Sequence, residues 1–197
     1  MGKGFKKRKG YSALRIISGQ WQSRPVYFID NENIRPTAER MRETLFNWLQ
    51  QKVQGRCCLD LYAGSGVLGI EALSRGAERC VFVDKESQNI AMIQEQLRGF
   101  AAEKQAIAIQ GQALQFAENY SGPAFSGVFM DPPYGQGDFA KIVSMLERKN
   151  LLQPSAWIYY EQRKGAESAE APGWECLKTS MVGQALGSLW VRNEEAR

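Results

Sequence analysis

The segment Asp131-Pro132-Pro133-Tyr134 combines residue types that could hold and activate an amino group. It follows the apolar run 128–130, which predicts a strand. Two successive prolines have no backbone N–H and keep the chain extended, so the Asp131 carboxylate and the Pro132 carbonyl should project as acceptors. Such a pair suits the two N–H donors of an exocyclic amino group on a base, with Tyr134 as a stacking surface. The structural alternative is a turn stopped by the two prolines.

A glycine-rich turn at residues 59–69, LDLYAGSGVLG, is the second candidate site. Gly64, Gly66 and Gly69 match GxGxxG, a pattern that brings the backbone close to a ligand at a helix N-terminus. Asp60 precedes these glycines and would repel a pyrophosphate, which disfavours a nicotinamide-dependent dehydrogenase. The same acid suits a cationic ligand that carries an ammonium and a sulfonium, as S-adenosylmethionine does. A plain glycine turn in an α/β protein is the alternative.

Asp84 comes directly after the next apolar run, Val81–Val83. Ligands of α/β sheets lie outside the carboxyl ends of the strands, where an acid can accept hydrogen bonds from both ribose hydroxyls. Asp84 could instead cap a helix that begins near Ser87. Together with the glycine turn, its position favours the ribose role.

Composition limits the chemistry further, because none of the 197 residues is histidine. This excludes Ser-His-Asp and Cys-His nucleophile pairs, HExxH zinc sites and a histidine general base. The four cysteines form no CxxC pair, so we expect no metal site and a reducing, cytoplasmic setting. No apolar run is long enough for a membrane span, and the N-terminus lacks the apolar region of a signal peptide.

The formal net charge of +4 is unevenly distributed. Residues 1–24 contain seven basic residues and no acid, whereas residues 25–197 contain 18 basic and 21 acidic residues. A basic arm of this kind usually neutralises phosphates, although it could also be a solvated tail. The residues expected to contact RNA are Lys6, Lys7, Arg8, Lys9, Arg15 and Arg24.

The elements that must position these residues follow an alternating pattern. Two short strands at 14–21 and 24–29 predict a hairpin, and Thr37 is expected to cap a helix that begins after Pro36. From residue 57, apolar strands alternate with helices, which indicates a parallel sheet covered on both faces. The expected strands are 57–62, 80–83, 106–109, 127–130 and 157–160, and the expected helices are 67–75, 87–98 and 139–146. Segments 174–180 and 188–192 predict an antiparallel ribbon at the sheet edge.

Long motifs in this chain resemble those of the RsmD family. They are Arg15–Gly19, Arg35–Arg40 leading to Arg42–Asn47, Leu59–Gly66 followed by Leu68–Ala77, and Asp131–Tyr134. The family comprises bacterial methyltransferases that use S-adenosylmethionine to methylate N2 of a guanine in small-subunit ribosomal RNA. The resemblance covers residues 14 to about 192, which is nearly the whole chain.

The resemblance implies an α/β, Rossmann-like class I methyltransferase with a mostly parallel sheet, an antiparallel C-terminal edge ribbon and an N-terminal β-hairpin extension. The expected division is a basic tail at 1–10, the hairpin extension at 11–34 and the methyltransferase domain at 35–197. The expected partner is 16S ribosomal RNA, in an assembly intermediate of the small subunit, and the protein is expected to be a cytoplasmic monomer.

The resemblance also assigns roles to individual residues. Asp131, Pro132, Pro133 and Tyr134 would hold the target base, and segment 35–37 would close over the cofactor. Gln112 stands where the family is expected to have an acid that receives the adenine amino group. The expected cofactor-binding residues are Arg35, Pro36, Thr37, Asp60, Tyr62, Ala63, Gly64, Ser65, Gly66, Gly69, Asp84, Lys85, Gln112 and Ala113.

The expected reaction is therefore methyl transfer from S-adenosylmethionine to the exocyclic N2 of a guanine in 16S ribosomal RNA. Two alternatives remain at this point. An adenine-N6 methyltransferase acting on RNA or DNA could use the same Asp-Pro-Pro-Tyr segment to hold the amino group of its base. A catalytically silent RNA-binding assembly factor could retain the fold.

Overall fold

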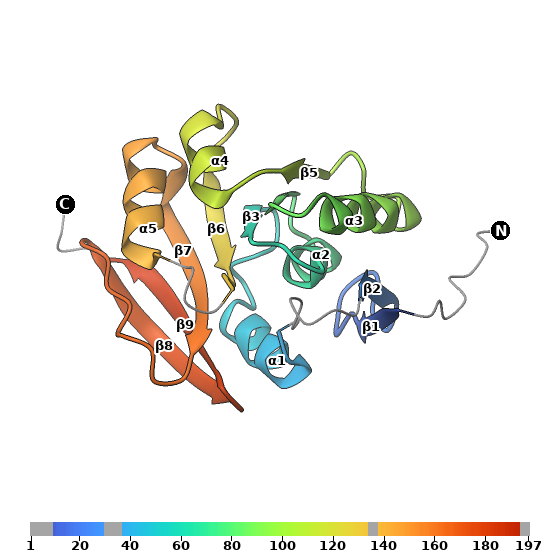
Figure 1. Cartoon of the computed structure of the whole chain (residues 1–197), viewed down its shortest axis with the longest axis horizontal. Helices are drawn as coiled ribbons and strands as arrows, with labels where there is room; N and C mark the ends of the chain where they lie inside the picture. The colour runs from blue at the N-terminus through green and yellow to red at the C-terminus, as the bar shows by residue number, and fades with distance from the viewer. Residues whose placement is uncertain (1–9, 30–36, 134–137, 194–197) are drawn as a thin grey trace.

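The computed structural model contains one seven-stranded sheet, a separate two-stranded sheet and five helices within the residues it describes, 10–29, 37–133 and 138–193 (Figure 1). The strands are β1 (Tyr11–Arg15), β2 (Pro25–Ile29), β3 (Cys57–Leu61), β4 (Arg79–Asp84), β5 (Ala106–Gln110), β6 (Phe125–Met130), β7 (Leu152–Arg163), β8 (Trp174–Val182) and β9 (Ala185–Arg192). The helices are α1 (Glu39–Trp48), α2 (Val67–Ser74), α3 (Ser87–Gly99), α4 (Ala113–Asn119) and α5 (Phe139–Arg148).

The large sheet has the strand order β5-β4-β3-β6-β7-β9-β8. Strands β5, β4, β3, β6 and β7 are mutually parallel, and β9 runs antiparallel to both β7 and β8. This confirms the Rossmann-like α/β prediction and the antiparallel ribbon at the C-terminal edge. It also brings the carboxyl ends of β3, β4, β5, β6 and β7 to one edge of the sheet, where ligands of such folds bind.

Helices cover the sheet on both faces. One buried cluster joins residues of α1, α2 and α3 to one face, and the other joins residues of α4 and α5 to the opposite face. Figure 1 shows α4 and α5 side by side. Side chains alternate along a strand, so Leu59 and Leu61 pack toward α4 and α5 while Cys58 packs toward the other helices. Asp60 therefore lies on the α1–α3 face.

The N-terminal hairpin pairs β1 with β2 antiparallel, from Tyr11↔Ile29 to Arg15↔Pro25. The prediction that its first strand spans 14–21 is wrong. Residues 16–21 leave the strand because their backbone binds α2 instead: the N–H groups of Ile17 and Ser18 donate to the Glu71 carboxylate, and that of Trp21 donates to Ser74 Oγ. The division into tail, hairpin extension and methyltransferase domain remains a prediction.

Two further local expectations are corrected. Thr37 does not cap the first helix, since the N-cap residue of α1 is Ala38, which makes no side-chain capping bond. Helix α4 was not expected; its seven residues bury only Ala113, Phe116 and Ala117, which is too short a stripe to give a clear helical period. The other predicted strands and helices of the sheet domain are confirmed, although β7 begins at Leu152, earlier than expected.

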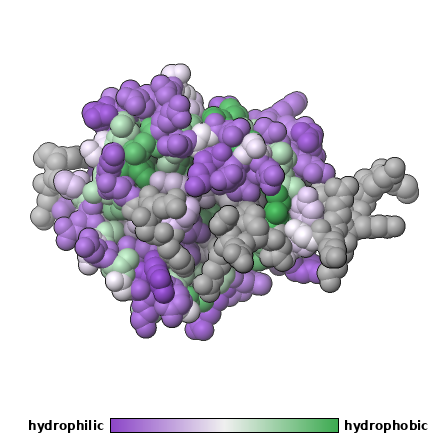
Figure 2. Space-filling model, viewed as in Figure 1, coloured by the Kyte–Doolittle hydropathy of each residue, from purple (hydrophilic) through white to green (hydrophobic). Residues whose placement is uncertain are grey.

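The face of the molecule in Figure 2 is mostly hydrophilic, with apolar residues scattered in small areas. Among the described residues, the exposed large apolar side chains are Ile107, Leu177 and Met181. None of the described helices is long and apolar enough to cross a membrane.

Candidate active site

The glycine turn after β3 has the backbone geometry that only small residues adopt easily. Gly64 and Gly66 have φ of 52° and 72°, and Gly66 is the N-cap residue of α2. A Cβ at Gly66 would press on the Ile93 side chain, so the α3 helix also restricts this position. Tyr62 shares the left-handed conformation, with φ of 67°. Within this turn Gly64 is partly exposed and Gly66 is buried at the start of α2.

Asp60 hydrogen-bonds to α2, the helix that follows this turn. Its side chain is 3% exposed, and Oδ2 accepts a hydrogen bond of 2.9 Å from the Gly69 N–H. Burial raises the pKa of Asp60 to about 7, the Gly69 bond opposes this shift, and the negative charge of Asp84 adds to it. A cation beside Asp60 would offset the desolvation of its ionised form.

Gly69 occupies a different environment from the other two glycines. It lies inside α2, is buried, and a Cβ there would overlap the Phe82 ring of β4. The absence of a side chain at Gly69 thus allows α2 to pack closely on β4, and the Gly69 N–H donates to Asp60. Ala63 and Ser65 are buried within the turn, and the Ser65 hydroxyl accepts from the Val67 N–H at 3.3 Å.

Asp84 connects the glycine turn to α3. One oxygen accepts from the Gly64 N–H at 2.7 Å, and the other accepts from the Glu86 N–H at 2.8 Å and from Asn89 Nδ2 at 3.1 Å. Asp84 does not occupy the N-cap position of α3, which belongs to Glu86, although it binds the Glu86 N–H. A carboxylate offers about four lone-pair sites, so these three contacts leave capacity for about one further hydrogen bond.

The neighbouring positions at this edge are more open. Lys85 is exposed, and its carbonyl accepts from Gln110 Nε2 at 3.2 Å. Gln112 is exposed at the N-cap position of α4, makes no capping bond through its side chain, and precedes the buried Ala113. Gln112 thus lies two residues beyond the carboxyl end of β5, the strand that pairs with β4.

Asp131 follows β6 at the same edge and is partly buried, between buried Met130 and buried Pro132. Its Oδ2 accepts a 3.2 Å hydrogen bond from the hydroxyl of Thr37, which is the observed role of the residue expected to cap α1. Burial raises the pKa of Asp131 well above its ordinary value, the charge of Glu161 raises it further, and the Thr37 bond opposes the shift. A carboxyl group with a raised pKa can accept a proton near neutral pH.

Glu161 is a site residue that sequence reasoning missed. It lies near the end of β7, is 5% exposed, and accepts a 2.7 Å hydrogen bond from the Tyr159 hydroxyl. The signal was present in the sequence, since Glu161 follows the apolar run 157–160 in the way that Asp84 and Asp131 follow theirs.

The two described arginines of the predicted RNA-binding set hold the hairpin in place. Arg24 donates to the Gly99 carbonyl at 2.8 Å, and its guanidinium lies 4.2 Å from the centre of the Phe100 ring. Arg15 donates to the Ser23 carbonyl at 2.9 Å. Both side chains are exposed, so a contact with RNA remains a prediction. The other predicted site residues that fall outside the described residues are Lys6, Lys7, Arg8, Lys9, Arg35, Pro36 and Tyr134.

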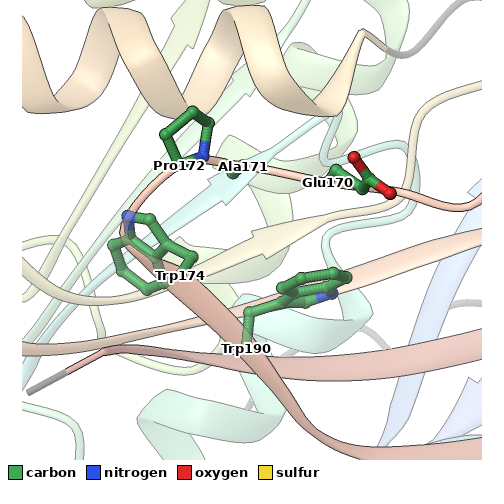
Figure 3. Close-up of a pocket in the computed structure, with 5 residues that line it drawn as sticks. All are labelled: Glu170, Ala171, Pro172, Trp174 and Trp190. Carbon is green, nitrogen blue, oxygen red and sulfur yellow. The ribbon is translucent and has the colours of Figure 1, made fainter. Parts of the chain in front are cut away.

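A separate shallow hollow of about 340 Å³ lies at the far edge of the sheet, lined by Glu170, Ala171, Pro172, Trp174 and Trp190 (Figure 3). Trp174 and Trp190 belong to the cluster on the α4 and α5 face, opposite Asp60. Their indole N–H groups donate to Glu147 and Ser188, respectively. The hollow is thus separate from the glycine turn. No group of metal-ligating side chains occurs among the described residues.

Comparison with known proteins identifies the family. Residues 14–191 match the family described as Conserved hypothetical protein 95. Ribosomal RNA small subunit methyltransferase D of Haemophilus influenzae is 36% identical over 172 residues, which cover 86% of this chain and 89% of that protein. The chain belongs to the RsmD family. The Escherichia coli K12 protein of the same name is 33% identical over 189 residues, covering 94% of this chain and 93% of that member.

The fold of this RsmD family member also matches solved structures. A structure described as a putative methyltransferase, yhhF, from Escherichia coli superimposes with a TM-score of 0.82 at 32% identity, and it covers 92% of this chain and 99% of that one. The Rossmann-like methyltransferase fold expected from the sequence is therefore confirmed.

Proposed function

We propose that this protein transfers a methyl group from S-adenosylmethionine to the exocyclic N2 of a guanine in 16S ribosomal RNA. The observation that carries the proposal is the meeting of Asp131-Pro132-Pro133 with the glycine turn at one edge of the sheet. In this arrangement the Asp131 carboxylate and the Pro132 carbonyl, which can accept from an amino group, lie at the same edge as the glycine turn, which would bind a nucleoside. The names of its relatives, ribosomal RNA small subunit methyltransferase D, support the choice of RNA.

The residues of the glycine turn fit the cofactor. Asp60 is a buried carboxylate whose pKa of about 7 reflects a poorly solvated charge, and an ammonium group would stabilise that charge. Asp84 would accept from a ribose hydroxyl, and the Gln112 amide would receive the adenine amino group. When bound, S-adenosylmethionine supplies an electrophilic methyl group on a sulfonium sulfur that leaves with the bonding electron pair.

Asp131 and the Pro132 carbonyl would orient the substrate. By accepting the two hydrogens of an amino group, they direct its lone pair out of the ring plane, where it can form the new N–C bond. Alignment of this kind accounts for several of the roughly 7–11 kcal/mol attributed to orientation effects. The raised pKa of Asp131 suits it to take up the proton that the amino nitrogen loses.

The target guanine must leave its stack to reach this pocket. Unstacking costs a few kcal/mol, which favours an irregular RNA site such as one in an assembly intermediate of the small subunit. The basic arm of residues 1–24 would hold the RNA through its phosphates without reading sequence. We further propose that the protein acts as a monomer in the cytoplasm.

The test uses the purified protein, labelled S-adenosylmethionine and small-subunit particles from cells that lack the gene. Digestion of the RNA and mass spectrometry of the nucleosides should show N2-methylguanosine. The Asp131→Ala variant should lose at least a hundredfold in rate, because it lacks the amino-group acceptor. It should still bind S-adenosylhomocysteine in calorimetry, since Asp60 and the glycine turn are intact.

Glu175→Ala provides the matched control, because Glu175 is an exposed acid on β8. This variant should keep the wild-type rate. Full activity of Asp131→Ala would remove Asp131 from the reaction. Formation of N6-methyladenosine would show that the target base is adenine and not guanine. RNA binding without any methyl transfer would indicate an assembly factor.

A further inference from the structure

Three acids lie on the same face of the sheet at the carboxyl ends of adjacent strands. Strands β3, β6 and β7 are neighbours, with Asp60 paired to Phe129 and Phe129 paired to Tyr159. Phe129 and Tyr159 both pack in the cluster under α1–α3. Side chains two residues apart along a strand point to the same face. Asp131 and Glu161, two residues after Phe129 and Tyr159, therefore lie on that face as well.

Asp131 and Glu161 are thus lateral neighbours. Met130 pairs with Tyr160 in the parallel register of β6 and β7, so the residues that follow them stand side by side on strands about 4.8 Å apart. The negative charge of Glu161 raises the pKa of Asp131, in agreement with this proximity.

The Glu161 carboxylate is held in place from the core side. The hydroxyl of Tyr159, a residue with no exposed surface, donates to Glu161 Oε2 at 2.7 Å. A carboxylate offers about four lone-pair sites, and the Tyr159 hydroxyl occupies one of those of Glu161. Neighbouring acids that perturb each other's ionisation occur often at functional sites, which favours a binding role for the pair.

We propose that Glu161 is a specificity-determining residue of the base pocket, which accepts a hydrogen bond from the N1–H of guanine while Asp131 and the Pro132 carbonyl hold the N2 amino group. This inference rests on the proposed function and adds a second contact to the same site.

The chemistry of the base edges supports this assignment. In guanine, N1–H and the N2 amino group are adjacent donors on the Watson–Crick edge, and two adjacent carboxylates match them. In adenine, N1 carries a lone pair beside the N6 amino group, so the same pocket would place an acceptor against Glu161. Sites built around a hydrogen bond reject analogues that lack the partner group far more strongly than apolar pockets do.

The experiment combines Glu161→Gln with 2-aminopurine, which lacks the N1–H and the O6 carbonyl of guanine. The loss of O6 applies to both proteins, so the difference between their preferences reports on N1. 2-Aminopurine keeps the amino group at C2 but has a lone pair in place of the N1–H. It is introduced by splint ligation at the guanine that the wild-type protein methylates, and the RNA is reconstituted into particles. Single-turnover rates of methyl transfer are then measured for both proteins on both particles.

The wild-type protein should prefer guanine over 2-aminopurine by about a hundredfold or more. In Glu161→Gln the preference should fall at least tenfold, because the amide can donate to the lone pair on N1. A merely structural role would lower both rates together and leave their ratio unchanged.

Tyr159→Phe is the matched control, since it keeps the carboxylate and removes the hydroxyl that holds it. This variant should react more slowly yet retain most of the preference for guanine. If Glu161→Gln does not fold, Tyr159→Phe still tests the inference. Equal rates of this variant on guanine and 2-aminopurine would contradict it. Binding of S-adenosylhomocysteine and the melting temperature report on folding in each variant.

An unchanged ratio in Glu161→Gln, with N2-methylguanosine still formed by the wild type, overturns this inference and leaves the proposed function intact. Failure of the wild-type protein to form N2-methylguanosine overturns both.

Discussion

At the scale of single residues, Asp60 combines a structural cost with the binding role that we propose for it. The pKa of this acid is about 7 in the folded protein and 3.8 for an ordinary aspartate. Between these values the folded chain holds the proton that the unfolded chain has released, so the stability contributed by Asp60 falls as the pH rises from about 4 to 7. Only the ionised form can pair with an ammonium group. Binding of such a ligand should therefore oppose this loss.

The affinity for S-adenosylhomocysteine should consequently rise by about tenfold between pH 5.5 and 7.5, as Asp60 ionises. Isothermal titration calorimetry at several pH values measures this trend. In Asp60→Asn the affinity should be lower and nearly independent of pH over the same range. The same slope in that variant would assign the titration to another group and contradict the role of Asp60.

Sequence patterns identified Asp60 and Asp131 because each interrupts or follows an apolar run beside a glycine or proline motif, and Asp84 because it follows the next apolar run after the glycine turn. Glu161 ends a run of the same kind but lacks such a motif beside it, and it was missed. The contact of Thr37 with Asp131 spans 94 residues of sequence, and no local pattern encodes a contact of that length.

At the scale of elements, Glu71 attaches the hairpin to the sheet domain. Its carboxylate has no exposed surface, accepts from the N–H groups of Ile17 and Ser18, and binds Arg75 Nε at 2.8 Å. Arg42, also fully buried, lies 3.7 Å away and donates to the Arg15 carbonyl. Glu71 therefore docks the first part of the loop between β1 and β2, while Ser74 binds its later residues.

Glu71→Ala should lower the free energy of unfolding by about 3–5 kcal/mol, because it leaves Arg42 as an uncompensated buried charge. Urea denaturation followed by circular dichroism measures the change. Glu147→Ala is the comparison, since Glu147 pairs with Arg192 in a partly exposed bridge and should cost about 1 kcal/mol or less. Equal losses in the two variants would show that Glu71 does not carry the docking.

The same contacts explain why the hairpin boundaries were hard to predict. Residues 14–21 alternate well enough for a strand, but the tertiary bonds to Glu71 and Ser74 take up the backbone donors of residues 17, 18 and 21. The strand-helix alternation from residue 57 was predictable because burial on both faces gives continuous apolar strands.

At the scale of the whole molecule, charge is separated into an acidic site and a basic arm. The acids Asp60, Asp84, Asp131 and Glu161 gather at the carboxyl edge of the sheet, whereas residues 1–24 carry seven basic residues. The hairpin of this arm packs beside α3, as Figure 1 shows. We infer that the arm holds RNA phosphates while the acidic edge receives one base.

Removal of residues 1–10 should weaken binding to 16S ribosomal RNA and reduce the slope of log affinity against log salt by about 3–4. The reason is the loss of five basic side chains, at Lys3, Lys6, Lys7, Arg8 and Lys9. Filter binding at several salt concentrations measures the slope. A double variant, Arg79→Gln with Lys104→Gln, removes exposed charges at the opposite edge and should leave the slope unchanged. An unchanged slope in the truncated protein would show that the tail is passive.

The central claim is methylation of guanine N2 in 16S ribosomal RNA, and the most direct test is mass spectrometry of nucleosides from that RNA. Cells carrying the gene, lacking it, and lacking it but expressing the Asp131→Ala protein are compared. N2-methylguanosine at one position should be present in the first and absent from the other two. Equal N2-methylguanosine in all three, or loss of N6-methyladenosine instead, would contradict the account.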